Sequence, residues 1–149
     1  MRVIYDADQE EWLFAEKGQG AWMNEARMRV SGRRTMSDCV FATGLPSAGR
    51  SDLPQTLTDL AQILPVSAGI RNLGAPALDL AYVAAGRVDG FWERRLKVWD
   101  MAAGLIILKE AGGFSESIHP GENSLEDGTL IAANDQIFTQ LAKAVRKSS

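Results

Sequence analysis

Asp100 is the residue whose type and position most clearly suggest chemistry. It stands where a strand-like run, 89–98, gives way to a long apolar segment, 101–111. If that segment is a helix, the free N–H groups and partial positive charge of its first turn would hold the carboxylate in place. A carboxylate fixed in this way can face outward and bind a hard cation such as Mg²⁺. The simpler interpretation is that Asp100 only caps the helix, since aspartate is among the best N-cap residues; taken alone, the residue favours the cap.

A second group of candidate residues lies upstream of Asp100. Gly74 and Ala75 are predicted at a strand-to-helix turn, where backbone N–H groups at the helix start could donate to the oxygens of a ligand. A tight junction that needs small residues explains the same pair. Pro76 suits a first helical turn but removes one N–H group. Glu93 is a carboxylate in the strand-like run that precedes Asp100, where it could accept hydrogen bonds from a ligand or pair with Arg94 or Arg95.

The other reactive residue types give little support to a nucleophilic mechanism. Cys39, the only cysteine, lies in a strand-like run and is predicted to be a small buried residue. A lone cysteine forms no internal disulfide, which is compatible with a reducing cytoplasm. His119, the only histidine, lies in a polar loop without a second His or Cys at metal-binding spacing, so we expect it on the surface.

Strand-like and helical patterns alternate along the chain and predict the elements that position these residues. Strands are expected over 2–5, 11–16, 21–30, 38–43, 66–73, 89–98, 114–118 and 129–133. Helices are expected over 52–64, 75–85 and 101–111, with a C-terminal amphipathic helix capped by Asp135. Loops are expected over 31–37 and 47–51. The first strands form a β-meander with Trp12, Phe14 and Trp22 on one face. The segment 101–111 is apolar nearly all round, so it must be buried between a sheet and another layer.

Composition places the chain among ordinary globular proteins. It has 149 residues, of which 46% are hydrophobic and 23% charged, so we expect one α/β domain over 1–149. The net charge of −3 gives no basic footprint, and no nucleic-acid partner is expected. No run approaches the apolar length of a membrane span and no signal peptide precedes the first strand, so we expect a cytoplasmic protein.

The run 69–113 resembles the C-terminal part of the inositol monophosphatase family of Mg²⁺-dependent, Li⁺-sensitive sugar phosphatases. The pieces that carry the resemblance are GIRNLG at 69–74, ALDLAYVAAG at 77–86, DGFWE at 89–93, WDMAA at 99–103 and EAGG at 110–113. Three further pieces match other parts of the family: AEKGQGA at 15–21, ATGLP at 42–46 and IAAN at 131–134. The resemblance therefore covers nearly the whole chain.

The resemblance implies a fold, an activity and roles for single residues. The fold is the C-terminal half of the layered α/β sandwich of these phosphatases. The activity is hydrolysis of a myo-inositol monophosphate by metal-activated water, with Asp100 as a metal ligand. Gly74 and Ala75 would give main-chain contacts to the substrate, and Glu93 would bind its sugar hydroxyls. We expect Asp100 at the mouth of a concavity, near the Ala75 turn and Glu93. Relatives acting on histidinol phosphate, fructose bisphosphate or 3′-phosphoadenylate share these motifs, so the substrate stays open.

Two features depart from the family pattern. The upstream Gly-Glu-Glu-type and Asp-Pro-x-Asp-Gly-Thr-type segments, which carry the other metal-binding carboxylates, are absent. We therefore expect a C-terminal half-protein with no complete catalytic set, inactive alone and oligomeric or in need of its N-terminal half. The alternative is a non-catalytic remnant that dimerises or binds partners through an exposed apolar face. In addition, Arg95 stands where many relatives carry glycine. Arg71 resembles an arginine near the family's subunit interface, and a surface salt bridge explains it equally well.

Overall fold

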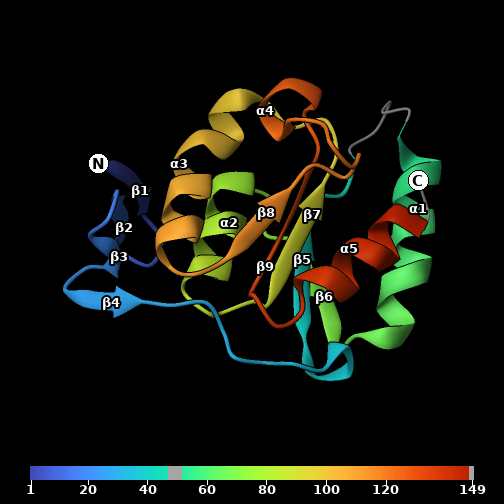
Figure 1. Cartoon of the computed structure of the whole chain (residues 1–149), viewed down its shortest axis with the longest axis horizontal. Coiled ribbons are helices and arrows are strands. Elements are labelled where there is room, and N and C mark those ends of the chain that lie inside the picture. The colour runs from blue at the N-terminus through green and yellow to red at the C-terminus, as the bar shows by residue number, and fades with distance from the viewer. Residues whose placement is uncertain (47–51, 148–149) are drawn as a thin grey trace.

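Two β-sheets and four of the helices are stacked in layers in the computed structural model, which describes residues 1–46 and 52–147 (Figure 1). The strands are β1 Arg2–Asp6, β2 Glu11–Glu16, β3 Gly20–Met23, β4 Ala26–Met28, β5 Val40–Thr43, β6 Gly69–Arg71, β7 Gly90–Glu93, β8 Phe114–Glu116 and β9 Leu130–Ala133. The helices are α1 Leu53–Ile63, α2 Pro76–Ala84, α3 Val98–Glu110, α4 Ser124–Asp127 and α5 Phe138–Lys147, with 3-10 turns η1 Met36–Asp38 and η2 Leu64–Val66.

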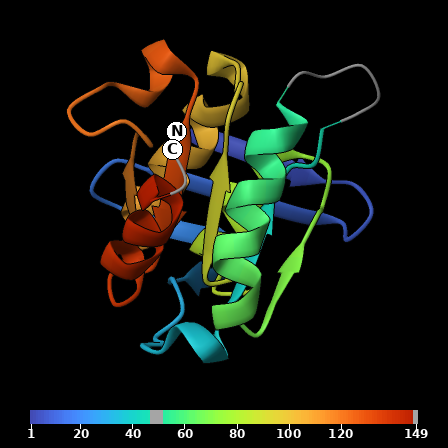
Figure 2. The same ribbon diagram turned by 90° about the vertical axis from the view of Figure 1, so that its right-hand side faces the viewer.

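The two sheets enclose one pair of helices, and a second pair covers the far side of the larger sheet. Strands β1–β4 form an antiparallel four-stranded sheet, and the five-stranded sheet has the order β6-β5-β7-β9-β8. Helices α2 and α3 pack against each other between the sheets, and α1 and α5 lie on the opposite face of the five-stranded sheet (Figures 1 and 2). This is the α/β layering that the sequence predicts.

The interior is divided into two apolar clusters by the five-stranded sheet. One cluster fills the space between the sheets and includes Leu13, Phe91 and Ile107; the other lies under α1 and α5 and includes Phe41 and Trp92. Helices α2 and α3 cross so closely that a Cβ atom at Gly104 would lie 2.7 Å from the Leu80 Cβ. The prediction that segment 101–111 is buried on several sides is confirmed, because α3 contacts both sheets and α2.

The four-stranded sheet has one buried and one outward face. Leu13 and Ala15 point into the core, whereas Trp12 is 53% exposed. The strand register aligns Phe14 with Trp22 across β2 and β3, so the predicted grouping of Trp12, Phe14 and Trp22 on one face is correct, and that face is the outward one. The predicted strand 21–30 is wrong as one piece, because Asn24 takes a left-handed φ of 54° and divides it into β3 and β4.

Several other predicted boundaries are also corrected. The strand expected over 89–98 ends at Glu93, and α3 already begins at Val98, so Asp100 lies within the first turn rather than before it. The start of α5 is capped by Asn134, not Asp135: the Asn134 Oδ1 accepts from the N–H groups of Gln136 and Ile137 at 2.9 and 2.8 Å. The short helix α4 interrupts the polar loop between β8 and β9. The loop expected over 47–51 lies outside the described residues.

The lone cysteine and histidine occupy the predicted surroundings. Cys39 is fully buried and its Sγ donates to the Thr35 carbonyl at 3.3 Å. Burial raises the pKa of the Cys39 thiol to about 11, which removes it as a nucleophile. His119 is exposed. Among the described residues, none of the helices combines the length and apolar character needed to cross a bilayer.

Candidate functional site

The carboxyl ends of three parallel strands converge on one pocket. Strands β6 and β7 both run parallel to β5, so the residues that follow them meet at the same edge of the sheet. Ligands of open α/β sheets bind at this kind of edge. The pocket has a volume of about 300 Å³ and is also bordered by the first turns of α2 and α3. Its lining comprises Gly44, Leu45, Asn72, Gly74, Ala75, Pro76, Asp79, Glu93, Arg94, Arg95, Leu96 and Asp100.

All four sequence-predicted site residues line this pocket: Asp100, Gly74, Ala75 and Glu93. They come from three different elements, and only the fold brings them together. Arg71 does not line it; that side chain is exposed and donates to the Ile70 carbonyl at 3.2 Å.

Asp100 is half-buried in the first turn of α3. One carboxylate oxygen, Oδ2, accepts a hydrogen bond from the Lys97 N–H at 2.9 Å, which fixes the side chain against the helix start. Trp99 is 76% exposed, so its ring does not hold Asp100 in place. The helix backbone, not a packed indole ring, orients this carboxylate.

The turn before α2 presents backbone groups to the pocket. Gly74 has a left-handed φ of 78°, a conformation that a side chain would strain, and Ala75 is extended. Pro76 is the first helical residue and has no N–H to offer. The next two N–H groups, of Ala77 and Leu78, have no acceptor within the helix, and no side chain caps this end of α2. This end of α2 can therefore donate to a ligand oxygen.

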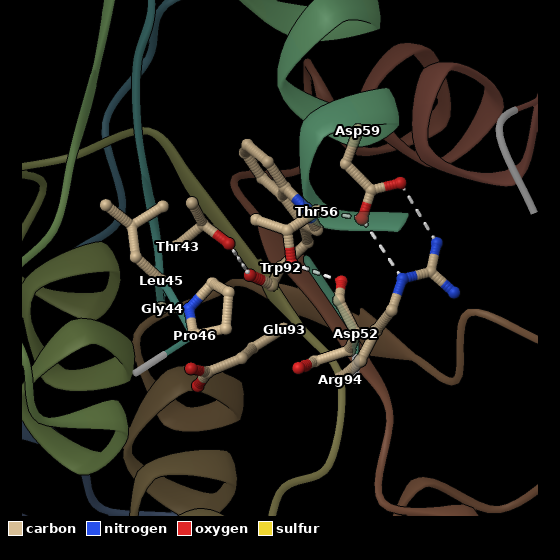
Figure 3. A pocket seen from close by; sticks show the side chains of 10 residues that line it. All are labelled: Thr43, Gly44, Leu45, Pro46, Asp52, Thr56, Asp59, Trp92, Glu93 and Arg94. Carbon is tan, nitrogen blue, oxygen red and sulfur yellow. Dashed lines mark hydrogen bonds and ion pairs between the residues drawn. The ribbon is translucent and has the colours of Figure 1, made fainter. Parts of the chain in front are cut away.

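Glu93 ends β7 and lies directly against the backbone of Gly44, which follows β5 (Figure 3). A Cβ atom at position 44 would lie 1.4 Å from the Glu93 Oε1. Glycine is therefore required at this position if the Glu93 carboxylate is to keep its place.

Arg94, which follows Glu93, forms an ion pair with Asp59, a carboxylate that the sequence analysis did not single out. Asp59 of α1 is 2% exposed and accepts from the Arg94 guanidinium at 3.0 and 3.1 Å, and from the Trp92 Nε1 at 3.3 Å (Figure 3). The pair borders a much smaller cavity, about 20 Å³, between α1 and the strand ends. Because the cation of Arg94 is matched by Asp59, it adds little net charge to the larger pocket.

Asp79 is a further pocket residue that the sequence analysis missed. It lies in the first turn of α2, is 1% exposed, and its Oδ1 is buried without a hydrogen-bond partner among residues 1–46 and 52–147. Burial raises the pKa of this carboxyl to about 7. The available signal was a carboxylate flanked by Leu78 and Leu80 on an otherwise apolar helix.

Arg95 borders the pocket in a strained backbone conformation. Its φ of 63° lies in the left-handed region that favours glycine. The half-exposed side chain reaches Asp52, with an Nε–Oδ2 distance of 3.9 Å. The structure thus explains why glycine would suit this position and adds a cation at the pocket mouth.

The described residues do not by themselves fit a magnesium centre. In the ranges 1–46 and 52–147, no group of three or more His, Cys, Asp or Glu side chains is placed to hold a metal ion. Asp100 can offer one carboxylate oxygen, whereas Mg²⁺ in phosphate-processing sites takes further carboxylates and ligand oxygens. A metal site here would need ligands from outside these residues.

The layered fold defines an α/β protein with a pocket at the strand ends that three carboxylates line. The sequence model of the inositol monophosphatase family matches residues 1–149, and the chain belongs to that family.

Individual relatives agree with this assignment. The chain is 46% identical to an inositol-1-monophosphatase of Mesorhizobium japonicum over 145 residues, which are 97% of this chain and 54% of the relative. It is 39% identical to the Nus factor SuhB of Pseudomonas aeruginosa, covering 97% of this chain and 54% of that protein. The crystal structure of the extragenic suppressor protein SuhB from Bartonella henselae superposes with a TM-score of 0.92 at 45% identity, covering 97% of this chain and 56% of that one. The chain spans about half the length of these relatives.

Proposed function

We propose that this chain supplies the sugar-binding part of a Mg²⁺-dependent phosphomonoesterase that hydrolyses myo-inositol monophosphate to inositol and phosphate. The observation that carries the proposal is the convergence of Asp100, the Gly74–Ala75 turn and Glu93 on one pocket in a member of this family.

Each residue has a role that its surroundings support. The Glu93 carboxylate, seated on Gly44, would accept hydrogen bonds from two adjacent hydroxyls of the inositol ring. The N–H groups that open α2 would donate to a hydroxyl or phosphate oxygen. Asp100 would contribute one carboxylate oxygen to a cation, with its other oxygen bound to the Lys97 N–H.

Hydrolysis itself needs more than these residues. A phosphate monoester requires an attacking water, neutralisation of the phosphoryl oxygens and assistance to the leaving oxygen. The described residues hold the sugar side of such a substrate but give only Asp100 as a cation ligand. We therefore expect no significant turnover of inositol 1-phosphate by the purified 149-residue chain in millimolar Mg²⁺.

The test adds the segment of a relative that this chain does not match. The chain is mixed with the segment of the Mesorhizobium japonicum relative that it does not match, and inositol 1-phosphate hydrolysis is measured with and without Mg²⁺. We expect Mg²⁺-dependent, Li⁺-inhibited turnover that Asp100→Asn and Glu93→Met each reduce at least tenfold, while Asp135→Asn on the surface leaves it unchanged. Turnover by the chain alone that Asp100→Asn abolishes would show that other carboxylates complete the site.

The substrate class is tested in the same assay. Histidinol phosphate, fructose bisphosphate and 3′-phosphoadenylate serve as alternative substrates, and preference for one of them would replace inositol phosphate in the proposal. The cation of Arg95 at the pocket mouth makes a substrate with a second anionic group a reasonable competitor.

A second candidate function rests on the outward face of the four-stranded sheet. Val3, Tyr5 and Trp12 are 41%, 48% and 53% exposed, and the rings of Tyr5 and Trp12 lie 4.5 Å apart. Exposed apolar surface of this kind promotes association. The alternative is a non-catalytic chain that forms a homo-oligomer through this face. It predicts that the chain associates with itself and that adding the segment of the Mesorhizobium japonicum relative produces no phosphatase activity.

A further inference from the structure

Asp79 is a buried pocket residue that the proposed function does not use. It is 1% exposed, lines the same pocket as Glu93 and Asp100, and its Oδ1 accepts no hydrogen bond from any residue that the structure describes. Leaving a buried carboxyl oxygen without a donor destabilises a fold. A residue in this state needs a partner that is not part of the described chain.

Asp89 shows how the same fold satisfies a buried aspartate elsewhere. Asp89 is 2% exposed and lies at the opposite end of β7 from the pocket. Its carboxylate accepts from the Val40 N–H at 2.9 Å, from the Ser31 hydroxyl and from the Arg33 guanidinium at 3.3 Å. Asp79 is as buried as Asp89 but has no such donors around its Oδ1 among the described residues. This difference points to a donor that a bound ligand supplies.

The surroundings of Asp79 select the type of donor. The Arg94 guanidinium is bound to Asp59. No group of three acidic, His or Cys side chains among the described residues is placed to hold a cation, so Asp79 is not part of such a cluster. A ligand hydroxyl group is a donor of the right chemistry for such an oxygen, and Glu93 in the same pocket is suited to hydroxyls as well.

We propose that Asp79 is a ligand-binding residue whose carboxyl group accepts a hydrogen bond from one hydroxyl of a polyol while Glu93 binds others. The inference rests on the proposed function and adds a specificity-determining residue to it. Burial raises the pKa of Asp79 to about 7, so near neutral pH the protonated form is also present. That form can donate to a hydroxyl oxygen as well as accept from a hydroxyl, and both hydrogen bonds suit a polyol.

The experiment measures binding of two probes, myo-inositol and inorganic phosphate, to the purified 149-residue chain by isothermal calorimetry or ligand-observed NMR. Asp79→Leu has no acceptor and should weaken myo-inositol binding about tenfold, the loss expected for one strong hydrogen bond. Asp79→Asn retains an acceptor oxygen and should stay within about threefold of the wild type. Neither variant should change phosphate binding. Asp89→Asn, buried but outside the pocket, should leave both affinities unchanged.

The outcomes separate this inference from the proposed function. If Glu93→Met weakens myo-inositol binding and Asp79→Leu does not, the inference is wrong and the proposed function stands. If the wild type binds phosphate but not myo-inositol, the polyol role of both carboxyl groups is overturned while a phosphate site stands. If it binds neither, both proposals are overturned together. Thermal melts check folding, and Asp79→Ala, which also lacks an acceptor and needs no added space, serves if the leucine variant does not fold.

Discussion

Replacing Asp79 with asparagine should change how the stability of the chain depends on pH. The carboxyl has a pKa of about 7 in the folded protein against an ordinary value of 3.8, because it is buried. Between these two values the folded chain holds a proton that the unfolded chain has released. The free energy of unfolding therefore falls as the pH rises from about 4 to 7, and the loss is complete above 7.

The expected change in the free energy of unfolding follows from the pKa shift of Asp79. A difference of about three pKa units corresponds to ~4 kcal/mol between the two ends of this window. For a chain of this length each kcal/mol changes the melting temperature by roughly 2–4 °C. Asparagine has the same shape but does not ionise. The melting temperature of the wild type minus that of Asp79→Asn should therefore fall by about 10 °C between pH 4 and pH 7.5.

The assay is thermal unfolding followed by circular dichroism in a pH series at constant ionic strength. Taking the difference between the two proteins cancels the titration of all other groups. Asp8→Asn, which removes an exposed carboxylate, controls for the change in net charge. A wild-type minus Asp79→Asn difference that is constant across the series would show that solvent reaches Asp79 and that the carboxyl ionises normally in the fold.

Three further results are expected. Gly44→Ala should weaken myo-inositol binding, since its Cβ would lie 1.4 Å from the Glu93 Oε1 and the carboxylate would have to move; unchanged affinity in calorimetry would show that the observed position of the Glu93 carboxylate does not matter for binding. Arg95→Gly should raise the melting temperature by a few degrees, because a left-handed φ of 63° costs a non-glycine residue about 1–2 kcal/mol; a decrease would show that the contact with Asp52 outweighs the strain. Trp12→Lys, on the outward face of the four-stranded sheet, should shift size-exclusion elution toward the monomer; a wild type that already elutes as a monodisperse monomer with a sharp, high melting transition would refute the idea that this face associates.

The layering of the fold could be predicted because it depends on patterns that the sequence carries locally. Helix α3 is apolar on all sides, and only a position between two other layers satisfies such a helix. Glycine and proline mark the ends of α2 and the start of α1, and these boundaries hold within one residue. The boundaries at β7 and α3 were wrong because residues 94–97 contain neither glycine nor proline to mark the end of the strand. The left-handed turn at Arg95 divides the two elements, and arginine gives no sign of such a turn.

The site could be predicted only in part, for a physical reason. Asp100, Glu93 and the Gly74 turn carry recognisable residue types at recognisable positions. Asp79 and Asp59 owe their importance to burial, which arises when α2 packs beneath the strand ends and α1 covers the far face of the sheet. From sequence alone, a carboxylate in a helix is expected to be exposed to solvent, and only the position of the neighbouring layer shows that it is buried. Whether the four predicted residues have the roles assigned to them stays a prediction.

The carboxylate of Asp100 has a structural role and faces a ligand pocket at the same time. One oxygen is committed to the Lys97 amide and so belongs to the architecture of α3, whereas the other belongs to whatever enters the pocket. Substitutions separate the two roles. Asparagine at position 100 keeps a carbonyl oxygen that can accept from the Lys97 N–H but loses the negative charge, whereas alanine loses both. A ligand that bound both oxygens would have to break the bond to the Lys97 N–H and loosen the first turn of α3. Occupancy of the pocket and fraying of that turn are therefore thermodynamically linked. Hydrogen exchange at the Lys97 amide would then report on ligand binding without any probe placed in the pocket.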